Sequence, residues 1–335
     1  MKKHTVVAFF GLAVSIILLY LALRGIEFYE IWATLKKTNP ALAFIPLIFI
    51  ACAVCLSSHK WSKIAGADVR FRETVVAMLI GLFVNNVLPA RLGEVAKGYV
   101  LSHKTNLSFT YSLASVALDH FFDLTALLLL TLLFFPRAHL PHAISEAIYV
   151  VVGVLLFCVL MIILLSRGGF ANRLSARLTK IERSFLSGFG RRIIEVQKNL
   201  KRISSPLTIV YLVIIASCAW LSMSMALYFV ILALGIHSVS FKAIPFVCAL
   251  LCFGVSIPSS PGYVGVYQFV LVYLLSIFGV PKYEGFAISV LYHVTWYVPY
   301  TLVGFFFSLR EHLRVRDIRT LQMRDKAPKL LRMGM

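Results

Sequence analysis

Long runs of hydrophobic residues recur along this chain and alternate with short polar segments. Most approach the roughly 20 residues that an α-helix needs to cross the hydrocarbon core of a bilayer. The pattern therefore predicts six full transmembrane helices. The runs cover residues 5–23, 41–57, 110–135, 146–165, 207–235 and 285–309.

Two further apolar segments, 73–103 and 243–280, each carry the pattern Pro-x-x-x-Gly, at 89–93 and at 258–262. Proline lacks a backbone donor and glycine readily adopts positive φ, so a helix is interrupted there. Interrupted backbone inside a membrane persists only beside protein or a cavity. We expect two re-entrant hairpins, and eight full spans are the alternative. Paired breaks of this kind are typical of transporters with a site near the membrane midplane.

Composition agrees with a membrane protein. Hydrophobic residues make up 60% of the 335 residues, charged residues 14%, and the mean hydropathy is +0.87. Soluble domains carry roughly 25% charged residues. The chain is therefore predicted to be an all-α polytopic membrane protein with one transmembrane domain, residues 1–335, which excludes a soluble enzyme.

The net charge of +19 would suit nucleic acid, but the basic residues gather on one side of the predicted spans. Positive-inside topology explains this more simply, so no nucleic acid partner is expected. The protein is predicted to lie in the cytoplasmic membrane, with both termini in the cytoplasm. The two hairpins then enter the membrane from opposite sides. The basic residues counted on the cytoplasmic side are Lys2, Lys3, Lys60, Lys63, Arg70 and Arg72, with the segments 166–205 and 310–335.

The first hairpin concentrates the polar chemistry. Arg91 could bind a lipid phosphate, because its planar guanidinium donates two parallel hydrogen bonds. Free amides near Arg91 and Gly93, at the start of a helix opened by Pro89, would assist. Glu94 could hold Arg91 or take a proton; alternatively, the two form only a structural ion pair. The candidate headgroup residues here are Asn85, Asn86, Arg91, Gly93, Glu94 and Lys97, with Asn85 and Asn86 capping the break.

The second hairpin is uncharged. Ser259 and Ser260 precede Pro261, a pattern that predicts a helix cap. The candidate headgroup residues are Ser259, Ser260, Gly262 and Gln268. The helix-breaking positions of the two hairpins are Pro89, Pro258, Pro261 and Gly265.

Asp119 and Asp123 lie four residues apart on one predicted helical face. Buried carboxylates need a partner or a proton, and Arg91 is the expected partner of one of them. Proton coupling or headgroup contact is one interpretation, and an internal salt bridge is the other. A metal site with His120 is disfavoured, because adjacent helical residues point about 100° apart. His293 lies among aromatic residues, where it either lines a cavity or packs against its neighbours. No metal or cofactor is predicted.

The stretches 86–97 and 258–268 resemble the two hairpins of the lysylphosphatidylglycerol synthase transmembrane-region family, also called the flippase-like domain family. The resemblance covers essentially the whole chain. It implies moving or handling of lipids, including polyprenyl- or aminoacyl-lipids. The chain departs from the family pattern at Lys97 and His120, where the family often has Arg, and at Gln268, where it frequently has Glu.

These observations predict a flippase-like transporter of a phosphate-bearing lipid, with membrane lipids as partners. The alternatives are an intramembrane enzyme, or a non-transporting partner of enzymes of lipid or lipid-linked glycan synthesis. Bifunctional members of the resembled family carry a soluble aminoacyl-transferase domain after the membrane region, whereas this chain ends soon after 285–309. Synthesis of lysyl lipid, or other enzyme activity, is therefore not expected.

Overall fold

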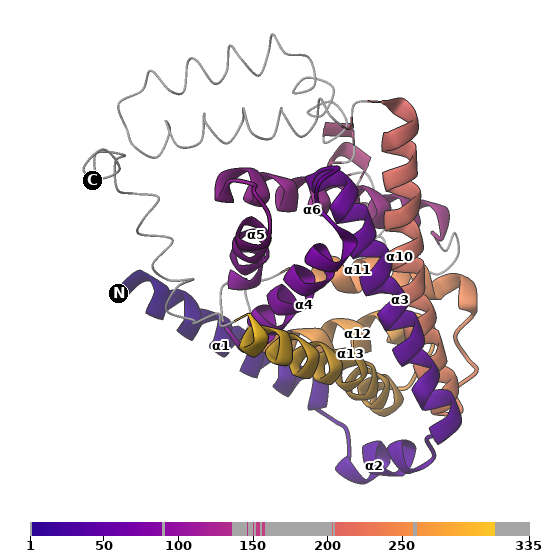
Figure 1. Cartoon of the computed structure of the whole chain (residues 1–335). Coiled ribbons are helices and arrows are strands. Elements are labelled where there is room, and N and C mark those ends of the chain that lie inside the picture. The colour runs from indigo at the N-terminus through magenta and orange to yellow at the C-terminus, as the bar shows by residue number, and fades with distance from the viewer. Residues whose placement is uncertain are drawn as a thin grey trace.

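A computed structural model of the protein describes residues 2–88, 91–135, 205–256 and 260–311, with a few positions between 146 and 203. Within these ranges the chain is helical and contains no strand (Figure 1). The prediction of an all-α membrane protein is confirmed. The predicted span at 146–165 lies largely outside the described residues, as do nearly all of the basic segment 166–205 and of the tail 310–335.

Several helices are long and apolar enough to cross a membrane. A further candidate span joins Gly11–Leu23, in α1 (Lys2–Leu23), to α2 (Phe28–Lys36) across an 80° bend. The multi-pass architecture is thereby confirmed. The four unbent candidate spans of the described ranges are α3 (Pro40–Ala65), α6 (Phe109–Leu133), α10 (Pro206–Ala233) and α13 (Lys282–Arg310).

Each predicted hairpin is a pair of helices that contact each other across an interruption. The first pair is α4 (Phe71–Val87) and α5 (Leu92–Lys104), separated by residues 88–91, the first break. The second pair is α11 (Ile244–Gly254) and α12 (Val266–Ser276), separated by residues 255–265, the second break. Short 3-10 turns, η1 (Phe241–Ala243) and η2 (Pro261–Tyr263), precede α11 and lie in the second break. The path of these pairs through a membrane stays a prediction.

Helix α4 lies at the centre of this arrangement (Figure 1). It contacts α3, α5 and α13, and it also contacts η2 of the second break. Its Leu79 belongs to a buried apolar cluster with α10 to α13, whereas Val76 and Ile80 belong to a second cluster with α3, α5 and α6. Helix α4, which leads into the first break, therefore packs against both apolar clusters.

Glycines allow α4 to approach its neighbours closely. A Cβ atom at Gly93 would overlap the carbonyl oxygen of Gly81 and the side chain of Asn85. A Cβ atom at Gly304, in α13, would overlap the carbonyl oxygen of Leu79. Only a residue without a side chain fits at these crossings.

Candidate functional site

The first break is capped from the preceding helix. The Oδ1 atom of Asn85 accepts a hydrogen bond from the Gly93 amide at 2.8 Å, and its Nδ2 donates to Glu94 Oε1 at 3.0 Å. The predicted capping role of Asn85 is confirmed. The Gly93 amide is therefore engaged, and the expectation that it is free for an anion is wrong.

Asn86 connects α4 to the last helix. Its Nδ2 donates to Thr301 Oγ1 at 2.9 Å, which ties α4 to α13. The Tyr297 hydroxyl, also on α13, donates to the Asn86 carbonyl oxygen at 3.4 Å. The side-chain amide nitrogen of Asn86 is thus turned towards the last helix. Its capping role stays a prediction, because Pro89 and Ala90 of the break lie outside the described residues.

Arg91 joins the first break to the second. Its Nη2 donates to the carbonyl oxygen of Val255 at 3.0 Å, and its guanidinium carbon lies 5.9 Å from the ring centroid of Tyr263. Arg91 has a left-handed backbone, with a φ of 52°, and its side chain is exposed. At Gly262, an added Cβ atom would lie 2.6 Å from a ring carbon of Tyr297. The two breaks therefore meet, and Arg91 lies at their junction.

Glu94 is paired with residues other than Arg91. Its Oε2 lies 3.2 Å from Lys97 Nζ and 2.6 Å from His120 Nε2. The proposed Arg91–Glu94 ion pair is therefore wrong. Lys97 is buried, and its stem lies against Gly81 of α4. His120, which stands where the resembled family often has Arg, thus contacts the carboxylate of Glu94.

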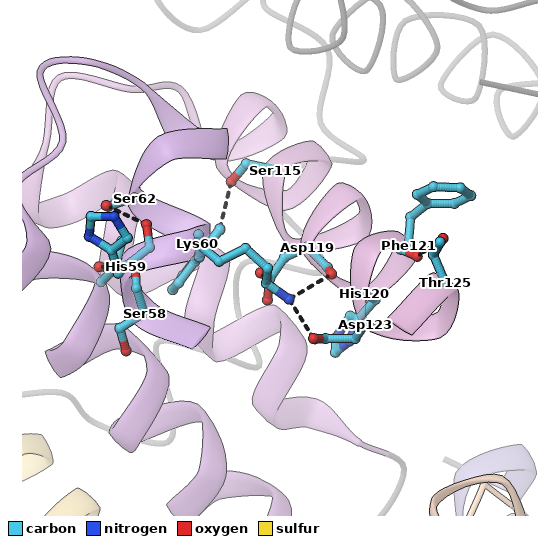
Figure 2. A network of polar contacts seen from close by, with 12 residues as sticks. Ser58, His59, Lys60, Ser62, Ser115, Asp119, His120, Phe121, Asp123 and Thr125 are labelled. Carbon is cyan, nitrogen blue, oxygen red and sulfur yellow. Dashed lines mark hydrogen bonds and ion pairs between the residues drawn. The ribbon is translucent and has the colours of Figure 1, made fainter. Parts of the chain in front are cut away.

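Asp119 and Asp123 are paired with Lys60, as Figure 2 shows. Lys60 reaches from α3 to α6, where its Nζ lies 3.1 Å from Asp119 Oδ1 and also contacts Asp123 Oδ1. It donates to the Asp119 carbonyl oxygen at 3.2 Å as well. The prediction that Arg91 partners these carboxylates is wrong. An internal salt bridge, the alternative interpretation, is what the structure contains.

Lys60 was not recognised in the sequence as a site residue, because the apolar run at 41–57 was expected to end before it. Instead α3 continues to Ala65, and Lys60 is fully buried rather than in a cytoplasmic loop. A signal was present: Ala53, Lys60 and Ile64 fall on one face of a helix, and all three are buried. A basic residue continuing an apolar stripe indicates a buried partner.

The contacts made by Glu94 and those made by Lys60 belong to one cluster of charged side chains. We call this cluster the charge network; its members are Lys60, Glu94, Lys97, Asp119, His120 and Asp123. Lys97 lies within electrostatic range of both Asp119 and Asp123. Trp220 on α10 donates to Asp123 Oδ1 at 3.3 Å. The network thereby connects α3, α5 and α6, with α10 at one side. Within the described ranges, no group of three or more His, Cys, Asp or Glu side chains is arranged so that it could hold a metal ion.

The second break is organised differently from the prediction. We expected Ser259 and Ser260 to cap a helix that starts at Pro261, but Pro261 opens the short η2 turn and α12 begins at Val266. The Gly265 amide, in a backbone with φ of 90°, donates to Gln268 Oε1 at 2.7 Å and is capped there. The Ser260 amide instead donates to Ser15 Oγ of α1 at 2.8 Å. Pro89, Pro258 and Ser259 lie outside the described residues.

Gln268 also contacts His293 in the last helix, with 2.9 Å between Nε2 and Nδ1. The His293 ring lies 4.6 Å from the Tyr267 ring and is stacked 4.8 Å from Trp296. His293 is only 6% exposed. It therefore packs among aromatic rings, which is the simpler of the two interpretations, and Gln268 is engaged within the protein.

The fold and these two meeting breaks define a polytopic membrane protein built on paired, interrupted hairpins. The chain belongs to the family described as the lysylphosphatidylglycerol synthase TM region, whose model matches residues 8–304. The resemblance seen in the hairpin motifs is thereby confirmed.

Curated relatives are similar over different shares of the chain. UPF0104 membrane protein MJ1078 of Methanocaldococcus jannaschii is 26% identical over 67% of this chain and 92% of its own length. UPF0104 membrane protein PH1989 of Pyrococcus horikoshii is 24% identical over 91% of this chain and 96% of its own. Glycosyltransferase AglD of Haloferax volcanii is 26% identical over 37% of this chain, but over only 20% of its own length.

Proposed function

We propose that this protein moves a phosphate-bearing lipid across the membrane, with the headgroup at the junction of the two breaks and the acyl chains in the bilayer. A phospholipid, an aminoacyl-lipid or a polyprenyl-linked lipid would meet this description. The observation that carries the proposal is the Arg91 guanidinium, exposed at the point where the two interrupted hairpins touch.

Arg91 suits a phosphate because a guanidinium presents five N–H donors in a rigid fork. The acceptor it contacts here is the neutral Val255 carbonyl, through Nη2. A phosphate oxygen forms a stronger, charge-assisted hydrogen bond than a neutral carbonyl does. A lipid phosphate can therefore compete for Arg91, and binding would loosen the contact between the two breaks. That link between binding and loosening is what alternating access requires.

The proposed activity is movement without chemical change. An acid or base in a lipid-phosphate enzyme needs a carboxylate that is available to the substrate. Asp119 is 2% exposed and is paired with Lys60, which supports a structural role for this carboxylate. The relative named a glycosyltransferase supports a second candidate function, partnership in lipid-linked glycan synthesis, in which the lipid would be polyprenyl-linked.

We also propose the cytoplasmic membrane as the location, with both termini in the cytoplasm. Helix α2, bent by 80° from α1, exposes Phe28, Tyr29 and Trp32. Aromatic residues are enriched where membrane meets water. This supports a membrane surface at the bend.

The test is reconstitution of the purified protein into liposomes containing fluorescent phosphatidylglycerol or a fluorescent polyprenyl phosphate. We expect the wild type and Arg310→Ala, a control that removes another exposed guanidinium, to move at least one lipid. Arg91→Ala should remain folded and lose at least tenfold in rate. Equal movement by Arg91→Ala would contradict the site. A chemically altered lipid, detected by mass spectrometry, would favour the enzyme alternative.

A further inference from the structure

The charge network has one buried end and one open end. At the buried end, the side chains of Lys60 and Asp119 are 0% and 2% exposed. At the other end, the side chains of His120 and Glu94 are 47% and 26% exposed. Of these groups, His120 is the one whose charge ordinarily changes near neutral pH. A titratable group therefore lies where the network can be reached from outside the helix bundle.

The network is unbalanced when His120 is neutral. Its carboxylates are Asp119, Asp123 and Glu94, and its ammonium groups are Lys60 and Lys97, which leaves one negative charge in excess. An uncompensated charge is costly inside a membrane. One proton on His120 removes the excess. Because Arg91 is directed to Val255 and Tyr263, it makes no contact with these carboxylates that would remove it instead.

The contact between His120 and Glu94 identifies the atom that takes the proton. An ionised carboxylate only accepts hydrogen bonds, so His120 Nε2, 2.6 Å from Glu94 Oε2, carries a hydrogen and donates. The lone pair of a neutral His120 is then on Nδ1. A proton from water binds there and produces an imidazolium, with Nε2 still donating to Glu94. Release of that proton restores the neutral ring, and no other bond changes.

The groups around His120 come from several elements. Helix α5 contributes Glu94 and Lys97, and α6 itself contributes Asp119 and Asp123. Helix α3 contributes Lys60 through these two aspartates, and α11 brings the Cys252 thiol near Asp123 and Arg91. Burial and Lys97 oppose the added charge, whereas Glu94 and Asp119 favour it.

We propose that the Glu94–His120 pair is a proton-binding site, and that lipid movement is coupled to the proton held there. The second clause rests on the proposed function, whereas the site itself does not. Loss of the proton leaves Glu94 with Lys97 as its charged partner, next to the first break. The charge of the network and the position of the break can therefore change together.

The site is tested directly by NMR of purified protein labelled with ¹⁵N-histidine in nanodiscs. The resonance that disappears in His120→Gln identifies His120. We expect it to change from imidazolium to imidazole between about pH 5 and pH 8, the range in which histidine charge usually changes. In Glu94→Gln the midpoint should move to lower pH, because the carboxylate that favours the cation is gone. A His120 resonance that does not change across this range would overturn the site.

The coupling is tested in the liposome assay with opposite pH on the two sides. Wild-type movement should change about threefold or more with the direction of the gradient, as a histidine switch near neutral pH allows. His120→Gln, never charged, and His120→Arg, always charged, should be insensitive to it. His237→Gln, which removes an exposed histidine outside the network, should behave as wild type.

These outcomes separate the two proposals. If wild type moves lipid at a rate independent of the gradient, the coupling is overturned and the proposed function stands. If His120 binds its proton but no lipid moves, the proposed function and the coupling fail, and the proton site stands.

Discussion

Arg91 and Tyr263 are in contact across the two breaks, and both have left-handed backbones, with φ of 52° and 61°. Within the described ranges, no other residue besides glycine has positive φ. Such a conformation costs on the order of 1–3 kcal/mol at each residue. Strained residues of this kind gather at binding and switching sites. The junction thus combines backbone strain with an exposed cation.

Arg91→Gly separates the role of the backbone from that of the side chain. Glycine adopts the φ of 52° without strain, which offsets the lost hydrogen bond to Val255. We expect the free energy of unfolding to change by no more than about 1 kcal/mol, whereas lipid movement is lost. Thermal unfolding in detergent and the liposome assay measure the two effects.

Arg72→Gly is the matched control for that variant. Arg72 is exposed within the ordinary helical backbone of α4, so glycine should destabilise it by about 0.5–1 kcal/mol. Lipid movement should persist. If Arg91→Gly moved lipid as well as wild type, its guanidinium would have no part in transport.

Lys60→Met should be strongly destabilising. It leaves the buried carboxylate of Asp119 without its cation, a change that typically costs about 3–5 kcal/mol. Adding Asp119→Asn should recover part of that loss, because the uncompensated charge is then removed. Lys63→Met, at an exposed position of the same helix, should have little effect. Reversible unfolding of wild type, Lys60→Met, Asp119→Asn and the double variant gives the coupling energy; identical stability of Lys60→Met and wild type would contradict the buried pair.

Gly93→Ala tests the close approach of α4 and α5. Its methyl group would overlap the Gly81 carbonyl oxygen and Asn85, so we expect a loss of about 1–3 kcal/mol. At Gly285 the nearest atom to an added methyl is 3.5 Å away, an ordinary contact. Gly285→Ala should therefore be tolerated. Comparable melting temperatures for the two variants would argue against the packing at the first break.

Gln268 can be tested with two substitutions. Gln268→Leu removes the acceptor of the buried Gly265 amide and should cost about 1–3 kcal/mol. Gln268→Glu keeps that acceptor and should be much less harmful, provided that His293 donates from Nδ1 to the carboxylate. Thermal unfolding distinguishes them. Equal losses would mean that the cap on α12 contributes little.

The features predictable from sequence were those set by local backbone chemistry. Proline removes a backbone donor and glycine admits positive φ, so the hairpins of 73–103 and 243–280 could be recognised from the repeated Pro-x-x-x-Gly spacing, although a single proline such as Pro46 or Pro299 lies within a continuous helix. Asn85 lies eight residues before the amide that it caps, which keeps its capping role within one hairpin. The apolar runs also located the long helices, although not the residue at which each one ends.

Contacts between distant segments could not be predicted in this way. The Asn86 side chain bonds to Thr301, 215 residues later, and neither residue type implies the other. The start of α12 at Val266 depends on Gly262 and Gly265, whose positive φ extends the second break beyond Pro261. The location of Lys60 depended on how far α3 extends, which hydropathy alone does not fix.

The bond from the Ser260 amide to Ser15 joins the first helix of the chain to the second break. The backbone of Ser15 also occupies the space that a side chain at Gly265 would need. During synthesis α1 emerges long before this partner, because 245 residues separate the two ends of the bond. Contacts between distant segments form late. Helix α1 is therefore synthesised before the segment that covers its Ser15 face, and we expect its docking to be among the last steps of folding.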